Sequence, residues 1–199
     1  MQLPFIYLAS ASPRRHELLK QIGVQHEILT VPTSEGAEDE PILAGEAPKD
    51  YVVRTAREKA QRALDYLKQQ SHRPVHPILA ADTCVMIEGQ VIDKAHSDED
   101  VRRSLQQLSG AVHKVQTHIV LINEDRLLER SSINTLHMRQ LSIAEIEHYV
   151  QSGEGLGKAG GYAIQGLGGM LIDKLEGSFT GVVGLPLSDT WELLRSIVD

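Results

Sequence analysis

The sequence feature that most restricts the fold is an apolar run, a small-residue turn and a helix signal near the N-terminus. The apolar residues 5–9 predict a buried strand. Ser12 suits a helix N-cap, Pro13 the first helical position and Gly23 the residue that ends the helix. The sequence therefore predicts strand, turn and helix in immediate succession.

Two arginines, Arg14 and Arg15, fall in the first turn of this expected helix, where the helix dipole disfavours cations. That penalty disappears if an anion is held there by backbone N–H groups, the hydroxyls of Ser10 and Ser12, and the two guanidinium groups. The alternative is two solvated arginines on a surface helix. We favour a site for phosphate groups.

Length, charge and cysteine content limit the remaining possibilities. With 199 residues, the chain can form one well-packed domain or two closely joined lobes. Its formal net charge of -7 disfavours sequence-independent binding of nucleic acid and makes a small polyphosphate the better anionic ligand. The single cysteine, Cys84, excludes an internal disulfide. Because neither a signal peptide nor an apolar stretch of about 20 residues is visible, we expect a cytoplasmic protein without a membrane span.

One carboxylate stands inside the most apolar stretch of the chain. Residues 75–87 predict a buried strand, yet Asp82 lies in the middle of them. A carboxylate in that position is costly unless it is paired, hydrogen-bonded or bound to a metal ion. A structural aspartate bonded to backbone N–H groups is the alternative, and we favour a metal ligand or general base.

Two lysines are candidates to lie near that carboxylate. Residues 48–69 predict a long helix, and Lys59 interrupts its apolar stripe, either pointing inward at an anion or lying at the stripe's edge. After a tight turn, residues 91–94 return along the strand and place Lys94 roughly opposite Thr83. The register does not fix the face on which Lys94 lies, and an exposed lysine at the strand end is the alternative.

An acidic run lies in the loop before the long helix. Residues 24–31 predict a strand, and residues 32–48 lack periodicity and predict a loop. The acids of this loop are most simply solvated. A carboxylate that faces a phosphate site would instead be a metal ligand, because hard cations prefer oxygen donors. Glu35, which comes soonest after the strand, is our candidate.

The rest of the chain alternates between strands and helices. Capping boxes at Ser97 and Ser142 predict two more helices. The other expected elements are strands over residues 112–122, 133–139 and 170–175, a turn over residues 177–181, and a final amphipathic helix that carries Trp191, Leu194 and Ile197. This alternation predicts an α/β protein with a mixed sheet and a cleft.

A glycine-dense segment, residues 153–169, precedes the last expected strand. Glycine lets the backbone approach a ligand closely, although a flexible hairpin loop is the alternative. Gln165 lies within this segment, and its amide offers both donors and an acceptor. Such a group suits the edge of a nucleobase.

Several motifs occur in a fixed order along the chain. They are Ser10-Ala11-Ser12-Pro13-Arg14-Arg15, Arg57-Glu58-Lys59-Ala60, Ala81-Asp82-Thr83, Leu108-Ser109-Gly110 with His113, Lys158-Ala159-Gly160 with Tyr162-Ala163-Ile164-Gln165-Gly166, and Val182-Val183-Gly184-Leu185-Pro186-Leu187. Together they resemble the motifs of the Maf family of nucleotide pyrophosphatases over essentially the whole chain. The ordered set is far more specific than any one of them.

The resemblance implies an α/β fold of the two-lobed Maf/ITPase-like type, a single domain over residues 1–199 with an extended mixed β-sheet and a central cleft. It implies a hydrolase that cleaves a nucleoside triphosphate to the monophosphate and pyrophosphate with help from a divalent metal cation. We expect Mg²⁺ or Mn²⁺, because the candidate ligands are carboxylates. A homodimer and a role in house-cleaning or cell-division arrest are further expectations at the level of the family.

The resemblance also implies roles for individual residues. Asp82 matches the catalytic carboxylate, the proton acceptor, and Glu35 matches the acid after the second strand; both are expected metal ligands. The positions expected to contact phosphate are Ser10, Arg15, Lys59 and Lys94. The positions tied to substrate choice are Arg14, Thr83 and Gln165, and with Arg15 they are similar to the branch that acts on dTTP and UTP, with modified pyrimidine nucleotides as further candidates.

Two rival classes remain open. A nucleotide-binding regulator of cell division or septum formation would hold a nucleotide without cleaving it, although binding alone needs no paired acids. A nucleic-acid-binding module is disfavoured by the net acidity and the few aromatic residues. Measuring pyrophosphate release with metal and then with chelator separates the enzyme from the regulator.

Overall fold

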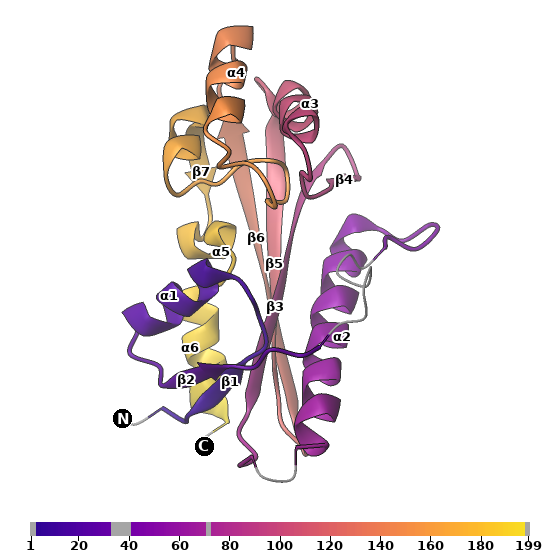
Figure 1. Ribbon diagram of the computed structural model, residues 1–199, viewed down its shortest axis with the longest axis vertical. Coiled ribbons are helices and arrows are strands. Elements are labelled where there is room, and N and C mark those ends of the chain that lie inside the picture. Colours follow the sequence, from indigo (N-terminus) through magenta and orange to yellow (C-terminus); the bar gives the residue numbers. More distant parts are fainter. Residues whose placement is uncertain (1–2, 33–40, 71–72, 198–199) are drawn as a thin grey trace.

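The computed structural model describes residues 3–32, 41–70 and 73–197 (Figure 1). Its strands are β1 (Ile6–Leu8), β2 (His26–Ile28), β3 (Ile78–Ile87), β4 (Gln90–Ile92), β5 (Val112–Ile122), β6 (Leu127–Met138) and β7 (Ile172–Glu176). Its helices are α1 (Pro13–Gln21), α2 (Pro48–Lys68), α3 (Asp98–Leu108), α4 (Ile143–Gln151), α5 (Phe179–Val183) and α6 (Leu187–Ser196), with a 3-10 helix over Leu167–Leu171.

The strands of the described chain form one mixed sheet. Six of them lie in the order β2-β1-β3-β5-β6-β7, and β4 pairs with β3 outside this path. β1 runs parallel to both β2 and β3, whereas the β3–β5, β5–β6 and β6–β7 pairs are antiparallel. The expectation of a mixed α/β fold is therefore confirmed.

One edge of β3 is shared by two short strands with a gap between them. β1 pairs with the start of β3 as far as Leu79, and β4 pairs with its end from Val85 onward. Among the described strands, residues 80–84 consequently pair with β5 alone. Asp82 and Thr83 lie in this gap, so their backbone is free of a strand neighbour on that side.

The alternation of side chains along β3 assigns these two residues to opposite faces of the sheet. Ile78 and Ala80 pack against α2 in one buried cluster, so Asp82 continues the row that faces α2. Leu79 and Ala81 belong to a second cluster with α1 and α6, so Thr83 faces those helices. Figure 1 shows α2 on one side of the sheet and α1 and α6 on the other.

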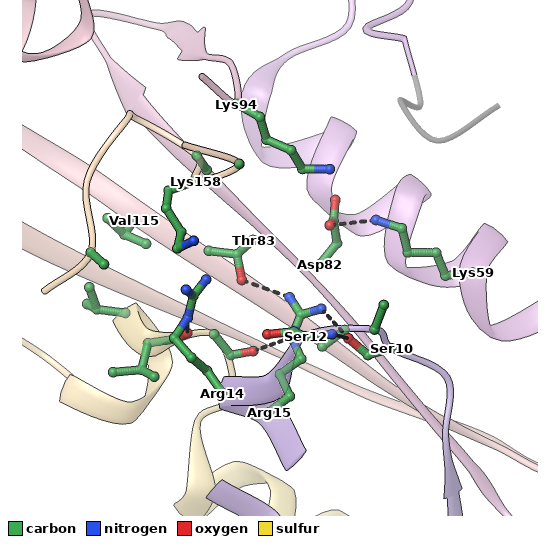
Figure 2. A pocket seen from close by; sticks show the side chains of 18 of the residues that line it. Ser10, Ser12, Arg14, Arg15, Lys59, Asp82, Thr83, Lys94, Val115 and Lys158 are labelled. Carbon is green, nitrogen blue, oxygen red and sulfur yellow. Dashed lines mark hydrogen bonds and ion pairs between the residues drawn. The ribbon is translucent and has the colours of Figure 1, made fainter. Parts of the chain in front are cut away.

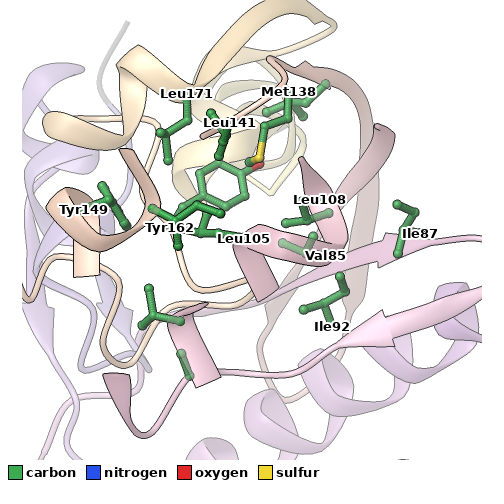
Figure 3. Packing of buried hydrophobic residues seen from close by; sticks show 14 of the residues in the cluster. Val85, Ile87, Ile92, Leu105, Leu108, Met138, Leu141, Tyr149, Tyr162 and Leu171 are labelled. Atoms are coloured by element: carbon green, nitrogen blue, oxygen red, sulfur yellow. The ribbon is translucent and has the colours of Figure 1, made fainter. Parts of the chain in front are cut away.

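A third core cluster covers the other end of the long strands (Figure 3). There Leu105 of α3 and Tyr149 of α4 pack with Val85 of β3, and Tyr162 and Leu171 join them from the glycine-dense segment and the 3-10 helix. The glycine-dense segment is thus tied to the hydrophobic core beside the end of β3.

Several expected boundaries differ from the structure. β2 covers only residues 26–28, β3 begins at Ile78, and β6 begins at Leu127 because it pairs with β5 along its whole length. The strand expected from residue 170 begins at Ile172, because the 3-10 helix occupies the preceding residues. The turn expected over residues 177–181 is largely the short helix α5, whose first turn is capped by the Ser178 hydroxyl.

Candidate active site

A cleft of about 730 Å³ opens at the gap on β3. Every described residue that the sequence assigned to the site lines it: Ser10, Arg14, Arg15, Lys59, Asp82, Thr83, Lys94 and Gln165. These residues come from the β1–α1 turn, α1, α2, β3, the chain after β4 and the glycine-dense segment, so the fold brings together side chains that lie far apart along the chain. Figure 2 shows how most of them face one another.

Asp82 is buried, and both of its carboxylate oxygens are held by α2. The Thr55 hydroxyl donates to Oδ2 at 2.5 Å, and the Lys59 ammonium donates to Oδ1 at 2.7 Å. Burial by itself raises the pKa of Asp82, but Lys59, Thr55 and Arg15 outweigh it and hold that pKa below its ordinary value. The side chain is therefore a carboxylate at neutral pH, and of the two alternatives for Lys59 the structure shows the inward one.

Arg15 joins the two walls of the cleft below Asp82. Its guanidinium donates to the Gly184 carbonyl at 2.8 Å, the Ser10 hydroxyl at 3.0 Å and the Thr83 hydroxyl at 3.2 Å. A bound anion would contact a guanidinium that three protein oxygens already hold in place, one of them on the loop before α6. The conformation of Arg15 is thereby determined before a ligand arrives.

The Thr83 hydroxyl is engaged by two protein groups. It lies 2.7 Å from the Thr117 hydroxyl, which donates to the Gly181 carbonyl at 2.7 Å. Because the Thr117 hydroxyl already donates its proton to that carbonyl, Thr83 donates to Thr117 and accepts from Arg15. Thr83 therefore fixes the position of Arg15.

Lys94 approaches the cleft from a bridge to the glycine-dense segment. The β3–β4 pairing ends at Val85 and Ile92, and Lys94 bridges Ala159 instead of pairing with Thr83 as expected. Figure 2 nevertheless shows the Lys94 side chain directed toward Asp82. Lys94 and Asp82 thus line the same cleft, and Lys94 reaches it by a backbone route other than the one expected.

Two cations lie side by side at the opposite end of the cleft. Figure 2 shows the Arg14 guanidinium next to the Lys158 ammonium, and Arg14 Nε donates to the Val183 carbonyl at 3.4 Å. Burial lowers the pKa of Lys158, and the charge on Arg14 lowers it further. An anion placed between them would relieve that repulsion, which supports the phosphate site expected at Arg14 and Arg15.

Glu35, the second expected carboxylate, lies outside the described residues. Among the described residues that line the cleft, Asp82 is the one carboxylate, and no three histidine, cysteine, aspartate or glutamate side chains of the described chain come together as a metal site. Magnesium is commonly held by one or two carboxylates together with substrate phosphates. The described donors fit that manner of binding.

Sequence reasoning missed several residues of this region. Thr55 is one helical turn before Lys59 and would have been found by asking what else on that face of α2 reaches Asp82. Arg62 lines the cleft one turn beyond Lys59, while Arg54 of the same helix pairs with Glu58. Thr117 gave no signal, because its role depends on the pairing of β3 with β5.

A family model described as Maf-like protein matches residues 5–197. The chain belongs to this family. A Bordetella avium protein named dTTP/UTP pyrophosphatase is 52% identical over 192 residues, which are 96% of this chain and 94% of that protein. A protein of the same name from Cupriavidus pinatubonensis is 42% identical over 192 residues, 96% of each chain, and one from Escherichia coli is 42% identical over 191 residues, 96% of this chain and 92% of that protein.

Among solved structures, the Ham1 protein of Staphylococcus aureus covers 67% of this chain and 71% of its own, with a TM-score of 0.45 and 16% sequence identity. A likeness at this level supports no conclusion about function. In the part of the chain that the structure describes, no helix has the length and apolar character needed to cross a bilayer.

Proposed function

We propose that this chain hydrolyses dTTP and UTP to the nucleoside monophosphate and pyrophosphate. The observation that carries the proposal is the meeting of an ionised Asp82 with Arg15, Lys59 and Lys94 in one cleft. The membership of the Maf-like family and the names of the curated relatives support the reaction and its substrates.

Asp82 is proposed to act on the attacking water. Its pKa lies below the ordinary value, so Asp82 is ionised at neutral pH, which is the form that can accept a proton. As the water oxygen bonds to the α-phosphorus, the bond from that phosphorus to the bridging oxygen breaks, and pyrophosphate leaves with the electron pair. The proton lost by the water passes to Asp82 and then to solvent, so the reaction balances.

The cations are proposed to stabilise the charge that develops on the leaving pyrophosphate. Arg15, Lys59 and Lys94 all line the cleft on the side of Asp82, and fixed cations aimed at developing charge are among the largest contributions to phosphoryl transfer. Ser10 adds a hydroxyl that already holds Arg15. Arg14 and Gln165 are proposed to act on substrate choice, and Thr83 to act by fixing Arg15.

A divalent cation, Mg²⁺ or Mn²⁺, is proposed to be held by Asp82, Glu35 and the substrate phosphates. When bound, such an ion neutralises phosphate charge and polarises the reacting phosphoryl group. Asp82 offers the hard oxygen donor that these ions prefer. Further proposals are that residues 1–199 form one domain of two lobes, that the protein forms a homodimer and that it is cytoplasmic.

The test is pyrophosphate release from dTTP and UTP by the wild type and by Asp82→Asn. We expect the substitution to lower kcat by about 10²- to 10⁴-fold, the usual contribution of a positioned proton acceptor. The asparagine keeps an acceptor oxygen for Thr55, and the variant is therefore expected to fold. Circular dichroism and the melting temperature check this.

The matched control is Asp125→Asn, which makes the same change on the exposed turn between β5 and β6. It is expected to leave turnover unaltered. Near-normal release by Asp82→Asn would remove Asp82 from the mechanism. If the wild type binds dTTP yet releases no pyrophosphate with Mg²⁺ or Mn²⁺, the proposed hydrolysis is wrong. If it releases pyrophosphate equally after chelation with EDTA, the proposed role of the metal is wrong.

A further inference from the structure

Glu154 joins separate points of the segment that forms one wall of the cleft. Its Oε1 accepts from the Leu167 N–H at 3.0 Å, and its Oε2 accepts from the Gly168 N–H at 2.8 Å. The same Oε2 accepts from the Tyr149 hydroxyl at 2.9 Å. The Tyr149 hydroxyl in turn accepts from the Ala163 N–H at 3.1 Å. We call these residues the Glu154 cluster.

The Glu154 cluster holds both ends of a short piece of backbone whose middle faces the substrate site. Ala163, Ile164 and Gln165 line the cleft; the Ala163 N–H at the start of this piece donates to Tyr149, and Glu154 accepts from the N–H groups two and three residues after Gln165. Gln165 is itself exposed, so its position depends on this backbone. Glu154 does not line the cleft, and it acts through the segment it holds.

Two glycines allow the close contacts within this segment, Gly166 with the carboxylate and Gly168 with the backbone of Ala163. A Cβ at Gly166, where φ is +90°, would lie 2.2 Å from Glu154 Oε1. A Cβ at Gly168 would lie 2.2 Å from the Ala163 carbonyl oxygen. Any side chain at either position would force the carboxylate or the backbone apart. Gly166 and Gly168 are therefore needed for this closed arrangement.

A carboxylate meets the demands of this position better than an amide of the same size. All three groups aimed at Glu154 are donors: two backbone N–H groups and one hydroxyl. An ionised carboxylate is an acceptor only, whereas a glutamine would turn its NH₂ group toward at least one of these donors. Leaving one such donor without an acceptor is costly in a half-buried site.

The charge of Glu154 also reaches the cations at this end of the cleft. Burial lowers the pKa of Arg14, and Glu154 together with Tyr149 opposes that change. Burial and Arg14 lower the pKa of Lys158, and Glu154 again opposes them. The carboxylate thus offsets part of the repulsion between the two cations while it holds the backbone.

We propose that Glu154 is the positioning residue for nucleobase recognition: by holding the backbone on both sides of Gln165, it determines which base the cleft accepts. This inference rests on the proposed function, because it assumes that a nucleotide binds in the cleft with its base near Gln165. Glu154 makes no contact with substrate in this account.

The test compares the binding of two non-hydrolysable probes, the α,β-methylene analogues of dTTP and dCTP, in the presence of Mg²⁺. Calorimetry gives the ratio of the two dissociation constants for the wild type, for Glu154→Gln and for Glu124→Gln, a matched control on the exposed turn between β5 and β6. We expect the preference for the thymine analogue to fall about tenfold in Glu154→Gln, the effect of losing one charge-assisted hydrogen bond. Glu124→Gln is expected to keep the wild-type ratio.

A second variant and a second measurement separate positioning from a general loss of structure. Tyr149→Phe removes the hydroxyl that joins Glu154 to Ala163, and it should lower the ratio in the same direction. Because both changes break one network, the double variant should lose little more of the preference for the thymine analogue than Glu154→Gln alone. Hydrogen exchange should show faster exchange confined to the amides of residues 163–168.

The proposal is overturned if the wild type does not discriminate between the probes. It is also overturned if Glu154→Gln keeps the ratio within about twofold, or weakens both probes equally with a matching loss of global stability. Binding does not require turnover, so these outcomes are separate from those that test hydrolysis: a wild type that cleaves neither dTTP nor UTP refutes the proposed function even where the ratio responds to Glu154.

Discussion

At the residue scale, the chemistry of this protein depends on how α2 holds Asp82. Thr55 and Lys59, one turn apart on the same helix face, each hold one carboxylate oxygen. Thr55 is completely buried and also lies 3.3 Å from the Val52 carbonyl. Removal of its hydroxyl would leave Asp82 with one donor fewer in a site where burial opposes ionisation.

We therefore predict that Thr55→Val lowers turnover and shifts its pH dependence. The lost hydrogen bond no longer favours the ionised form, so the pKa of Asp82 rises and the acidic limb of the profile of kcat against pH moves to higher pH. A decrease of about tenfold in kcat at neutral pH is expected for one lost hydrogen bond to a charged group. The measurement is pyrophosphate release between about pH 3 and pH 8, a range that includes the ordinary aspartate pKa of about 3.9.

Two controls distinguish this effect from damage to the helix. Thr55→Ser keeps the hydroxyl and should restore both rate and profile. Thr190→Val removes another fully buried helical threonine hydroxyl, one bonded to the Pro186 carbonyl in α6, and should affect stability without moving the acidic limb. An unshifted limb in Thr55→Val would exclude a role for Thr55 in tuning Asp82.

Single residues were predictable from the sequence where their surroundings made them conspicuous. Asp82 stood alone in an apolar strand and Lys59 interrupted an apolar stripe, and the structure pairs them. Thr55 and Glu154 gave no such signal, because a threonine in a helix and a glutamate beside glycines have ordinary explanations. Their importance depends on which distant backbone they meet, and a single sequence does not reveal that.

At the element scale, the sequence predicted what local physical chemistry decides. The capping boxes at Ser97 and Ser142 begin α3 and α4 as expected, and β5 has the expected bounds. The errors fall where tertiary contacts decide: Gly181 packs against Ser132 and Asn134, and this close contact accompanies a helical turn in place of the expected loop turn. The same holds for β6, which extends to match β5.

The contact between β5 and the glycine-dense segment leads to a prediction about stability and pH. His113 of β5 is buried, its Nε2 lies 2.6 Å from the Tyr162 hydroxyl, and its Nδ1 has no hydrogen-bond partner among the described residues. Burial, and to a lesser degree His137, lowers the pKa of His113 to about 4. The folded protein therefore resists a proton that the unfolded chain accepts near pH 6.5.

Because the pKa is lower in the folded state, this histidine makes the protein less stable as pH falls. The contribution is fully present above about pH 6.5, is lost progressively as pH falls, and is gone below about pH 4. The loss is about 3 kcal/mol at most, from 1.36 kcal/mol per pKa unit. Urea unfolding at several pH values should show that the free energy of unfolding decreases less steeply with falling pH in His113→Asn than in the wild type. An equal dependence on pH in both proteins would contradict this account.

At the scale of the whole molecule, positive charge is concentrated in the cleft of an acidic protein. The net charge is -7, yet the described lining includes Arg14, Arg15, Lys59, Lys94 and Lys158 around the single described carboxylate. Motifs and resemblance assigned Arg14, Arg15, Lys59 and Lys94 to the site, but they gave Lys158 no role there. The sequence did not predict the gap between β1 and β4 that makes room for the cleft, because the gap depends on strand register.

A polyphosphate ligand should therefore stabilise the folded protein by mass action. At 100 times its dissociation constant, the α,β-methylene analogue of dTTP is expected to add about 2.7 kcal/mol, which corresponds to a rise of roughly 5–10 °C in melting temperature for a chain of this length. The rise should shrink at high salt, since screening weakens the attraction to phosphate.

Thermal unfolding with and without the analogue checks this prediction. Arg14→Gln should reduce the rise, whereas Lys20→Gln, an exposed change in the same helix, should leave it intact. A saturating analogue that leaves the melting temperature unchanged would show that the charged cleft is not a polyphosphate site.

β3 also has a mechanical consequence for the enzyme. This strand contributes to all three hydrophobic clusters, and it passes without interruption beneath the cleft, from the parallel pairing with β1 to the hairpin with β4. Separate rotation of the two ends about a loose connection is thereby ruled out. Whatever widening admits a nucleotide and releases its products must come from elastic bending or twisting of β3 and its neighbours, so the stiffness of a continuous sheet sets how far the entrance can open.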